Sequence, residues 1–160
     1  MKARIEKLSE KKLIGICKPM SFADYNPAEL WKTLMPRRKE IINNLGTNLY
    51  SIEIYKDLSF FQNFDPKNKF EKWAAIEVSN FENIPDKMEK LIIPDGLYAV
   101  FIYKGLSSEV PKIYTQIFTD WLPNSDYQLD NRPHFALMGD KYKHNDPASE
   151  EEIWVPVKYK

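Results

Sequence analysis

The chain has 160 residues, the usual length of one domain, and its 23 basic and 23 acidic side chains cancel. This balance argues against nucleic acid as a direct partner, because phosphate binding needs a basic surplus or patch. The longest apolar stretches, such as residues 97–103, fall well short of the ~20 residues of a membrane span. We therefore expect a single domain over residues 1–160, located in the cytoplasm, without nucleic acid or membrane partners.

The single cysteine, Cys17, excludes an internal disulfide and favours a reducing compartment. It stands among apolar residues, which predicts a buried structural thiol in preference to a nucleophile. Aromatic residues make up 14% of the chain. Such a content serves core packing and also suits a pocket that holds flat ligands.

The first half of the chain predicts a strand pair, a helix and two further strands. The pair comprises residues 5–8 and 12–18. A helix should begin after Asn26 as N-cap, with Pro27 in its first position and Glu29 completing a capping box.

Pro36 falls inside the helical pattern and should kink or restart the helix. Residues 50–55 and 73–78 then predict two strands, and the phenylalanines between them are assigned to a loop or a hairpin tip.

The second half repeats this order. Residues 88–92 and 97–103 predict strands, and a helix capped by Ser107 or Ser108 follows. The last two strands are expected at residues 135–138 and 152–157. Two helices among about eight strands indicate an α+β fold with an antiparallel sheet, made of two similar modules. Pockets favour the seam between such modules.

Five short strings make the sequence more specific. In chain order they are EKWAAIEV (71–78), IPDGLYAVF (93–101), DWLPNS (120–125), DNRPHF (130–135) and EEEIWVPV (150–157). Together they resemble the GyrI-like, AraC-type bacterial effector-binding domain family over nearly the whole chain. The resemblance implies duplicated β-α-β-β modules with two helices flanking a central groove. It also implies flat, lipophilic and often cationic ligands that sit in this groove.

One position departs from the family pattern. Relatives commonly carry a glutamate just after the Pro-His-Phe string, and here Ala136 stands in its place. Without a carboxylate a buried cation loses several kcal/mol of affinity. Either the ligand is neutral, or another acid such as Glu77 or Glu152 replaces the missing one.

The expected ligand-binding set combines aromatic residues, two acids and the residues beside the Pro-His-Phe string. Alternation along the strands groups Trp73 with Glu77, and Glu152 with Trp154, but the sequence does not say which face lines the groove. Core packing is the alternative for the aromatic residues, and a solvated strand face is the alternative for the acids. The set is Trp73, Glu77, Tyr98, Tyr103, Ala136, Met138, Glu152 and Trp154.

The leading functional hypothesis is a small-molecule-binding module that acts as a sensor, a sequestering protein or an effector domain of a transcription regulator. A hydrolase of reactive aromatic compounds and a protein-inhibiting module of the gyrase-inhibitor type are the alternatives. Both predicted helices belong to the core, so no helix-turn-helix is expected. We expect no metal, because His134 and His144 are too far apart in sequence, and no cofactor, because a Gly-rich phosphate loop is absent. We assign no catalytic residue and expect a monomer or weak dimer, with a protein partner as the alternative to a small molecule.

Overall fold

The computed structural model describes residues 1–144 and 146–160. The described residues form a largely antiparallel α+β fold. Its strands are β1 (Arg4–Leu8), β2 (Lys11–Ser21), β3 (Leu49–Ile54), β4 (Lys69–Val78), β5 (Glu89–Ile93), β6 (Gly96–Lys104), β7 (Tyr127–Leu129), β8 (His134–Met138) and β9 (Glu150–Tyr159). Its α-helices are α1 (Pro27–Leu34), α2 (Ser59–Gln62) and α3 (Val110–Gln116). A 3₁₀ turn (Met35–Glu40) extends α1, another (Ser107–Glu109) precedes α3, and a π-helical turn (Ile117–Trp121) extends α3.

The chain contains the same unit twice. In the first unit β2 leads through α1 to β3 and β4, and in the second β6 leads through α3 to β8 and β9. In each unit the first strand pairs with the last, as β2 with β4 and β6 with β9. The two units meet where β3 pairs with β8, so the expected duplicated β-α-β-β modules are confirmed, with β3 and β8 at the seam.

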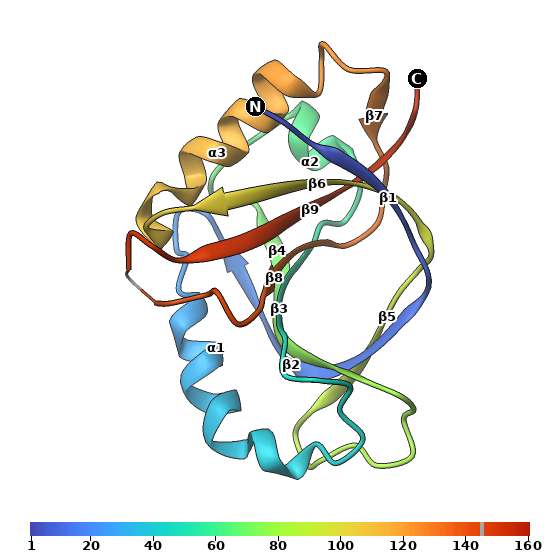
Figure 1. Ribbon diagram of the computed structural model, residues 1–160, viewed down its shortest axis with the longest axis vertical. Coiled ribbons are helices and arrows are strands. Elements are labelled where there is room, and N and C mark those ends of the chain that lie inside the picture. The colour runs from blue at the N-terminus through green and yellow to red at the C-terminus, as the bar shows by residue number, and fades with distance from the viewer. Residues whose placement is uncertain (145) are drawn as a thin grey trace.

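A second junction closes the sheet on itself. The strand order runs β1-β6-β9-β8-β3-β4-β2-β5, and its two end strands continue directly into β2 and β6. The ribbon β1–β2 therefore pairs with the ribbon β5–β6 in one unbroken register, from Arg4 opposite Val100 to Gly15 opposite Glu89. In Figure 1 the strands accordingly curl round a common interior.

Both long helices cover the outer face of this curled sheet. Leu30 and Leu34 of α1 pack on β2 and β4, and Ile117, just after α3, packs on β6 and β9. In Figure 1 both helices lie on the same side of the molecule. Burying these two apolar helix stripes and the sheet interior supplies most of the driving force for folding. No helix in the described ranges is both long enough and apolar enough to cross a membrane.

Some local predictions were wrong. Asn26 makes no side-chain cap on α1, and Glu29 does not close a capping box, because its carboxylate accepts hydrogen bonds from Lys18 at 3.1 Å. Neither predicted serine caps the second helix with its side chain. The phenylalanine-rich segment includes α2 in addition to loop, and β7 was not predicted. At Pro36 the helix changes to the 3₁₀ form, which agrees with the expected interruption.

Candidate functional site

We call the strip of outer sheet face at the module seam, between the strands that α1 and α3 cover, the groove, and small residues form its floor. Cross-strand pairs place Ala74, Ser51, Ala136 and Ile153 in one row on the outer face. Ser51 and Ala136 are only half-buried, although both belong to central strands. The small side chains and their exposure show that neither helix fills the space above them.

One end of the floor is buried and polar. Glu53 on β3 lies between Lys72 on β4 and His134 on β8, and these side chains are only 7%, 3% and 3% exposed. In the part of the chain that the structure describes, Oε2 of Glu53 is buried with no hydrogen-bond partner. No ion pair within 4.0 Å joins Lys72 to a carboxylate among these same residues. A buried acid and a buried base thus stand side by side without direct contact.

Aromatic rings wall this polar end. The Lys72 ammonium lies 5.4 Å from the ring centroid of Tyr25, which precedes α1. Tyr55 packs edge-on against the His134 ring at 5.0 Å. Phe61 of α2 reaches Phe118 beside α3 at 5.2 Å, so these two rings come together next to His134.

Burial and neighbouring charges shift the pKa values of several groups in the groove. Burial lowers the pKa of Lys72, but the Glu53 carboxylate and then Tyr25 outweigh this effect and raise it above its usual value. Burial, followed by the charge of Glu53, raises the pKa of Tyr55 and of Tyr114 on α3 well above that of free tyrosine. At neutral pH Lys72 therefore stays an ammonium, and the tyrosines stay protonated hydrogen-bond donors.

The other end of the groove is more open. Glu151 on β9 lies opposite Tyr103 on the groove face, and burial raises the pKa of its carboxyl while Lys72 opposes this rise. A depression of about 330 Å³ beside the loop that connects β8 and β9 also touches Glu151, but its other strand residues, such as Leu137 and Glu152, belong to the inner face, so it is not part of the groove floor. The Tyr103 hydroxyl donates a hydrogen bond to the Leu106 carbonyl, so its own polar group is already satisfied.

The structure divides the expected ligand-binding set between two faces of the sheet. The residues that it places on the groove face are Tyr103, Ala136 and Met138. The residues that it places on the inner face of the curled sheet are Trp73, Glu77, Tyr98, Glu152 and Trp154. A strand presents alternate residues to opposite faces, so these two subsets do not line one pocket.

Both acids considered as replacements for the family glutamate belong to the inner subset. Glu77 accepts a hydrogen bond from the Tyr50 hydroxyl at 3.3 Å and pairs with Lys11 at 3.2 Å. Glu152 accepts hydrogen bonds from Trp154 Nε1 and from Arg4 Nη2, both at 3.0 Å. Their partners are side chains of the chain itself, and neither acid shares the face of the sheet with position 136.

Trp73 and Tyr98 also make internal contacts. Trp73 is 4% exposed, and Nε1 donates a hydrogen bond to Glu71. Tyr98 is fully buried and donates a hydrogen bond to the Pro133 carbonyl at 2.7 Å. Both residues pack in the apolar cluster that fills the inside of the sheet, which matches the core-packing alternative.

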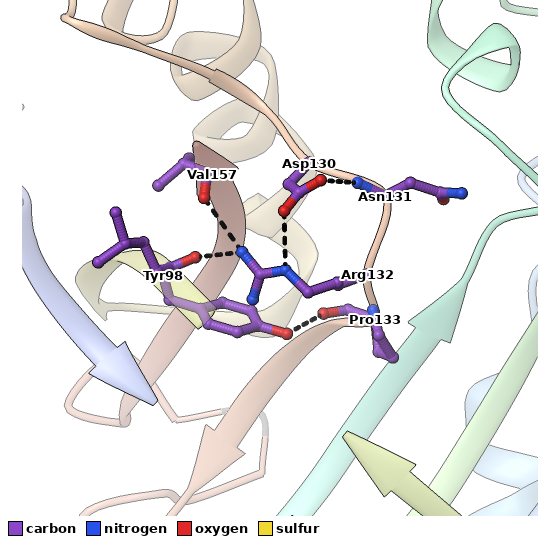
Figure 2. A network of polar contacts seen from close by, with 7 residues as sticks. Tyr98, Asp130, Asn131, Arg132, Pro133 and Val157 are labelled. Atoms are coloured by element: carbon purple, nitrogen blue, oxygen red, sulfur yellow. Dashed lines mark hydrogen bonds and ion pairs between the residues drawn. The ribbon is translucent and has the colours of Figure 1, made fainter. Parts of the chain in front are cut away.

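The DNRPHF string builds a structural anchor beside β8. Figure 2 shows the Arg132 guanidinium over the Tyr98 ring, 4.7 Å from its centroid. Its nitrogens donate to Asp130 at 3.0 Å and to the carbonyls of Leu97 and Val157 at 2.6 and 3.0 Å. Arg132 thereby ties the start of β8 to β6 and β9, and it fixes the strand that carries His134 and Ala136.

Sequence reasoning missed the polar end of the groove. Glu53 and Lys72 were not among the expected site residues, although Ser51 and Glu53 on β3, followed by Tyr55, alternate with apolar residues and form a polar row. A charge in the middle of a central strand is rare unless it is paired or functional, and this was the signal available. Within the described ranges, no group of three or more His, Cys, Asp and Glu side chains is placed to hold a metal ion.

Comparison with known proteins gives three kinds of match. The model of a family described as the GyrI-like small molecule binding domain matches residues 1–158. The transcriptional regulator BrlR of Pseudomonas aeruginosa is 22% identical over 130 residues, which are 81% of this chain and 45% of BrlR. The chain thus spans about half the length of this curated relative.

Solved structures share the fold at low identity. SAV2435 bound to tetraphenylphosphonium superposes with a TM-score of 0.70 at 19% identity, covering 99% of this chain and 94% of that one. EcmrR, solved in a complex with DNA, superposes with a TM-score of 0.70 at 19% identity, covering 99% of this chain and 58% of that one. These likenesses show the fold of the described residues.

Proposed function

Since the chain belongs to the GyrI-like family of small-molecule binding domains, we propose that it binds a lipophilic aromatic compound in the groove between α1 and α3. In this role it acts as a sensor, a sequestering protein or the effector domain of a transcription regulator. The observation that carries this proposal is the buried, unpartnered Oε2 of Glu53, which lies at the aromatic end of a floor of small residues. An unsatisfied buried acceptor costs about 1–3 kcal/mol, and a bound ligand that donates a hydrogen bond recovers this cost.

The groove suits aromatic ligands for a second reason. Tyr25, Tyr55, Tyr114 and Phe118 are only partly covered, so a flat ligand would bury their remaining surface together with its own. Each Å² of apolar surface removed from water contributes roughly 25 cal/mol, and aromatic pairs add about 0.5–1.5 kcal/mol.

Of the expected set, we propose that the groove-face residues contact the ligand and that the inner-face residues support the floor from behind. The proposed contacts are Tyr103, Ala136 and Met138. The proposed supporting residues are Trp73, Glu77, Tyr98, Glu152 and Trp154. A tryptophan or tyrosine behind the sheet can then affect binding only through the position of the strands.

The test begins with thermal-shift screening of aromatic compounds, both cationic and neutral, against the wild-type protein. Tetraphenylphosphonium belongs in the panel because SAV2435 was solved with it. A ligand at 100 times its Kd should add about 2.7 kcal/mol of stability. Ser51→Trp fills the groove floor and should abolish the shift.

The matched control, Ile92→Trp, adds the same side chain at an outer position on β5 that is already 45% exposed, and it should keep the shift. A shift that survives Ser51→Trp would place the ligand elsewhere and contradict the proposal. The compound should also be recovered unchanged after incubation. Turnover would instead favour the hydrolase alternative.

We further propose a cytoplasmic location, which fits the free thiol of Cys17. We also propose a monomer or weak dimer in solution, for which size-exclusion chromatography over a range of concentrations is the direct measurement. A protein partner bound through the outer surface remains the alternative if no small molecule stabilises the fold.

A further inference from the structure

We propose that Lys72 makes this groove select neutral aromatic compounds with a hydroxyl group, which accepts a hydrogen bond from Lys72 and donates one to Glu53. This inference rests on the proposed function of the groove and names the ligand class of the same site. It assigns to Lys72 the role of a specificity-determining residue.

The first support is the geometry of the buried pair. Glu53 and Lys72 are direct cross-strand neighbours, so their Cβ atoms lie about 4.5–5.5 Å apart. Among the described residues they nevertheless form no ion pair within 4.0 Å, and Oε2 of Glu53 has no partner. A single oxygen at about 2.8 Å from each group would bridge them. A hydroxyl fits this gap because it is both donor and acceptor.

The second support is the charge already present. Lys72 is 3% exposed, and its raised pKa keeps it an ammonium at neutral pH, so the Glu53 carboxylate has a permanent counter-charge. A ligand cation at this end would meet the Lys72 charge with little water to screen it. Position 136, on the same face of the neighbouring strand, is an alanine that adds no negative charge. Lys72 therefore balances the charge of Glu53 at this end, and the further carboxyl within electrostatic reach of Lys72 is Glu151, whose pKa burial raises.

The third support is the excess of donors around Glu53. Tyr25, Tyr55 and Tyr114 stay protonated because burial raises their pKa values, so each of them offers a hydroxyl donor. Lys72 is a donor only. A hydroxyl ligand supplies an acceptor to this donor-rich wall and still offers its own proton to Glu53. A water molecule could make the same bridge, and a hydroxyl that reproduces its hydrogen bonds loses nothing on displacing it.

The experiment compares three probes of similar shape by isothermal titration calorimetry. Triphenylmethanol is neutral and carries the hydroxyl, its methyl ether keeps the acceptor but lacks the donor, and tetraphenylphosphonium is a permanent cation. In the wild-type protein we expect triphenylmethanol to bind about 10-fold or more tightly than either of the others, the effect of one hydrogen bond to a charged group. Equal or tighter binding of tetraphenylphosphonium, or equal binding of the ether, would overturn the inference.

Two variants distinguish a specific effect of Lys72 on binding from an effect of the net charge of the protein. Lys72→Met should lower the affinity for triphenylmethanol and raise the affinity for tetraphenylphosphonium, because Glu53 then faces the groove without its counter-charge. Lys18→Met removes the same charge from the cross-strand neighbour of Lys72, which is half exposed and paired with Glu29, and it should change neither affinity. An equal change in both variants would contradict a specific role for Lys72.

Lys72→Met leaves a buried carboxylate unpaired and can therefore fail to fold. The double variant Glu53→Gln/Lys72→Met removes both charges and should fold, with no gain for tetraphenylphosphonium. Such a gain would overturn the inference. If none of the three probes binds wild-type protein, and no compound of the broader panel does, the proposed groove function fails and the inference fails with it. If tetraphenylphosphonium binds more tightly than triphenylmethanol, the inference fails but the proposed function of the groove stands.

Discussion

Acid should destabilise this fold through His134, the histidine at the polar end of the groove. Burial, followed by the charge of Arg132, lowers the pKa of His134 from 6.5 to about 3. Between these values the unfolded chain binds a proton that the folded protein does not bind, so stability falls as the pH falls from about 6.5 towards 3. A difference of one pKa unit between the folded and unfolded states corresponds to 1.36 kcal/mol of stability. Between pH 7 and pH 5, about 1.4 pKa units of the difference at His134 take effect. The expected loss is about 2 kcal/mol, or roughly 4–8 °C in Tm.

The assay is urea denaturation at pH 7 and pH 5 for the wild type and for His134→Gln. Glutamine does not titrate, so the variant should lose about 2 kcal/mol less than the wild type over this interval. Glu151 acts in the opposite direction, because its raised pKa means that the folded protein binds its proton more readily. Both proteins contain Glu151, so its contribution cancels in the comparison.

Identical pH dependence in the two proteins would refute the reasoning. So would an NMR titration that places the His134 imidazole near pH 6.5. Either result would show that Glu53, the cross-strand neighbour of His134, compensates the imidazolium charge despite burial.

Two other sites give direct predictions. Gly96→Ala should destabilise the fold by several kcal/mol, because its φ is +153° and the new Cβ would lie 2.5 Å from Cζ and Nη1 of Arg132. Gly46→Ala is the control in urea denaturation, since its φ is also positive at +81° but nothing lies within 4 Å, and about 1 kcal/mol is expected. Equal costs would show that the contact with Arg132 is unimportant. Cys17 should react with iodoacetamide at pH 8 roughly 50-fold more slowly than an unfolded cysteine, because burial and then the hydrogen bond to Glu89 raise its pKa to about 12. Reaction at the unfolded rate would contradict this, and Glu89→Gln should accelerate it.

The strands and their duplicated order could be predicted from the sequence, because alternating apolar residues and turn signals are local properties. Residues 97–103 and 73–78, for example, lie within β6 and β4. The resemblance implied a groove position for Ala136, and the structure puts this residue opposite Ser51 on the outer face at the seam. That expectation came from a known arrangement and not from periodicity.

The orientation of each strand could not be predicted. Alternation groups Trp73 with Glu77, but it assigns them equally well to either face, and only the packed helices decide which face is outside. The acids at positions 77 and 152 were chosen for their charge, and both proved to have partners on the inner side. Glu53 and Lys72 lie on consecutive strands of the chain, β3 and β4. The aromatic rings around this end of the groove, however, come from α2, from the turn after α3 and from the segment before α1.

The unbroken ribbon that closes the sheet has a consequence for the order of folding. Within each module the paired residues, such as Lys12 and Val78, are closer in the chain than the residues that the ribbon joins, such as Arg4 and Val100. Long-range pairing incurs the loop-closure entropy before it gains contacts, and folding slows as such pairing increases. The two modules should therefore form early as separate nuclei, and their union should limit the overall rate. Because the groove spans the seam, it does not exist until that union is complete, so a ligand can report only on molecules that have finished folding.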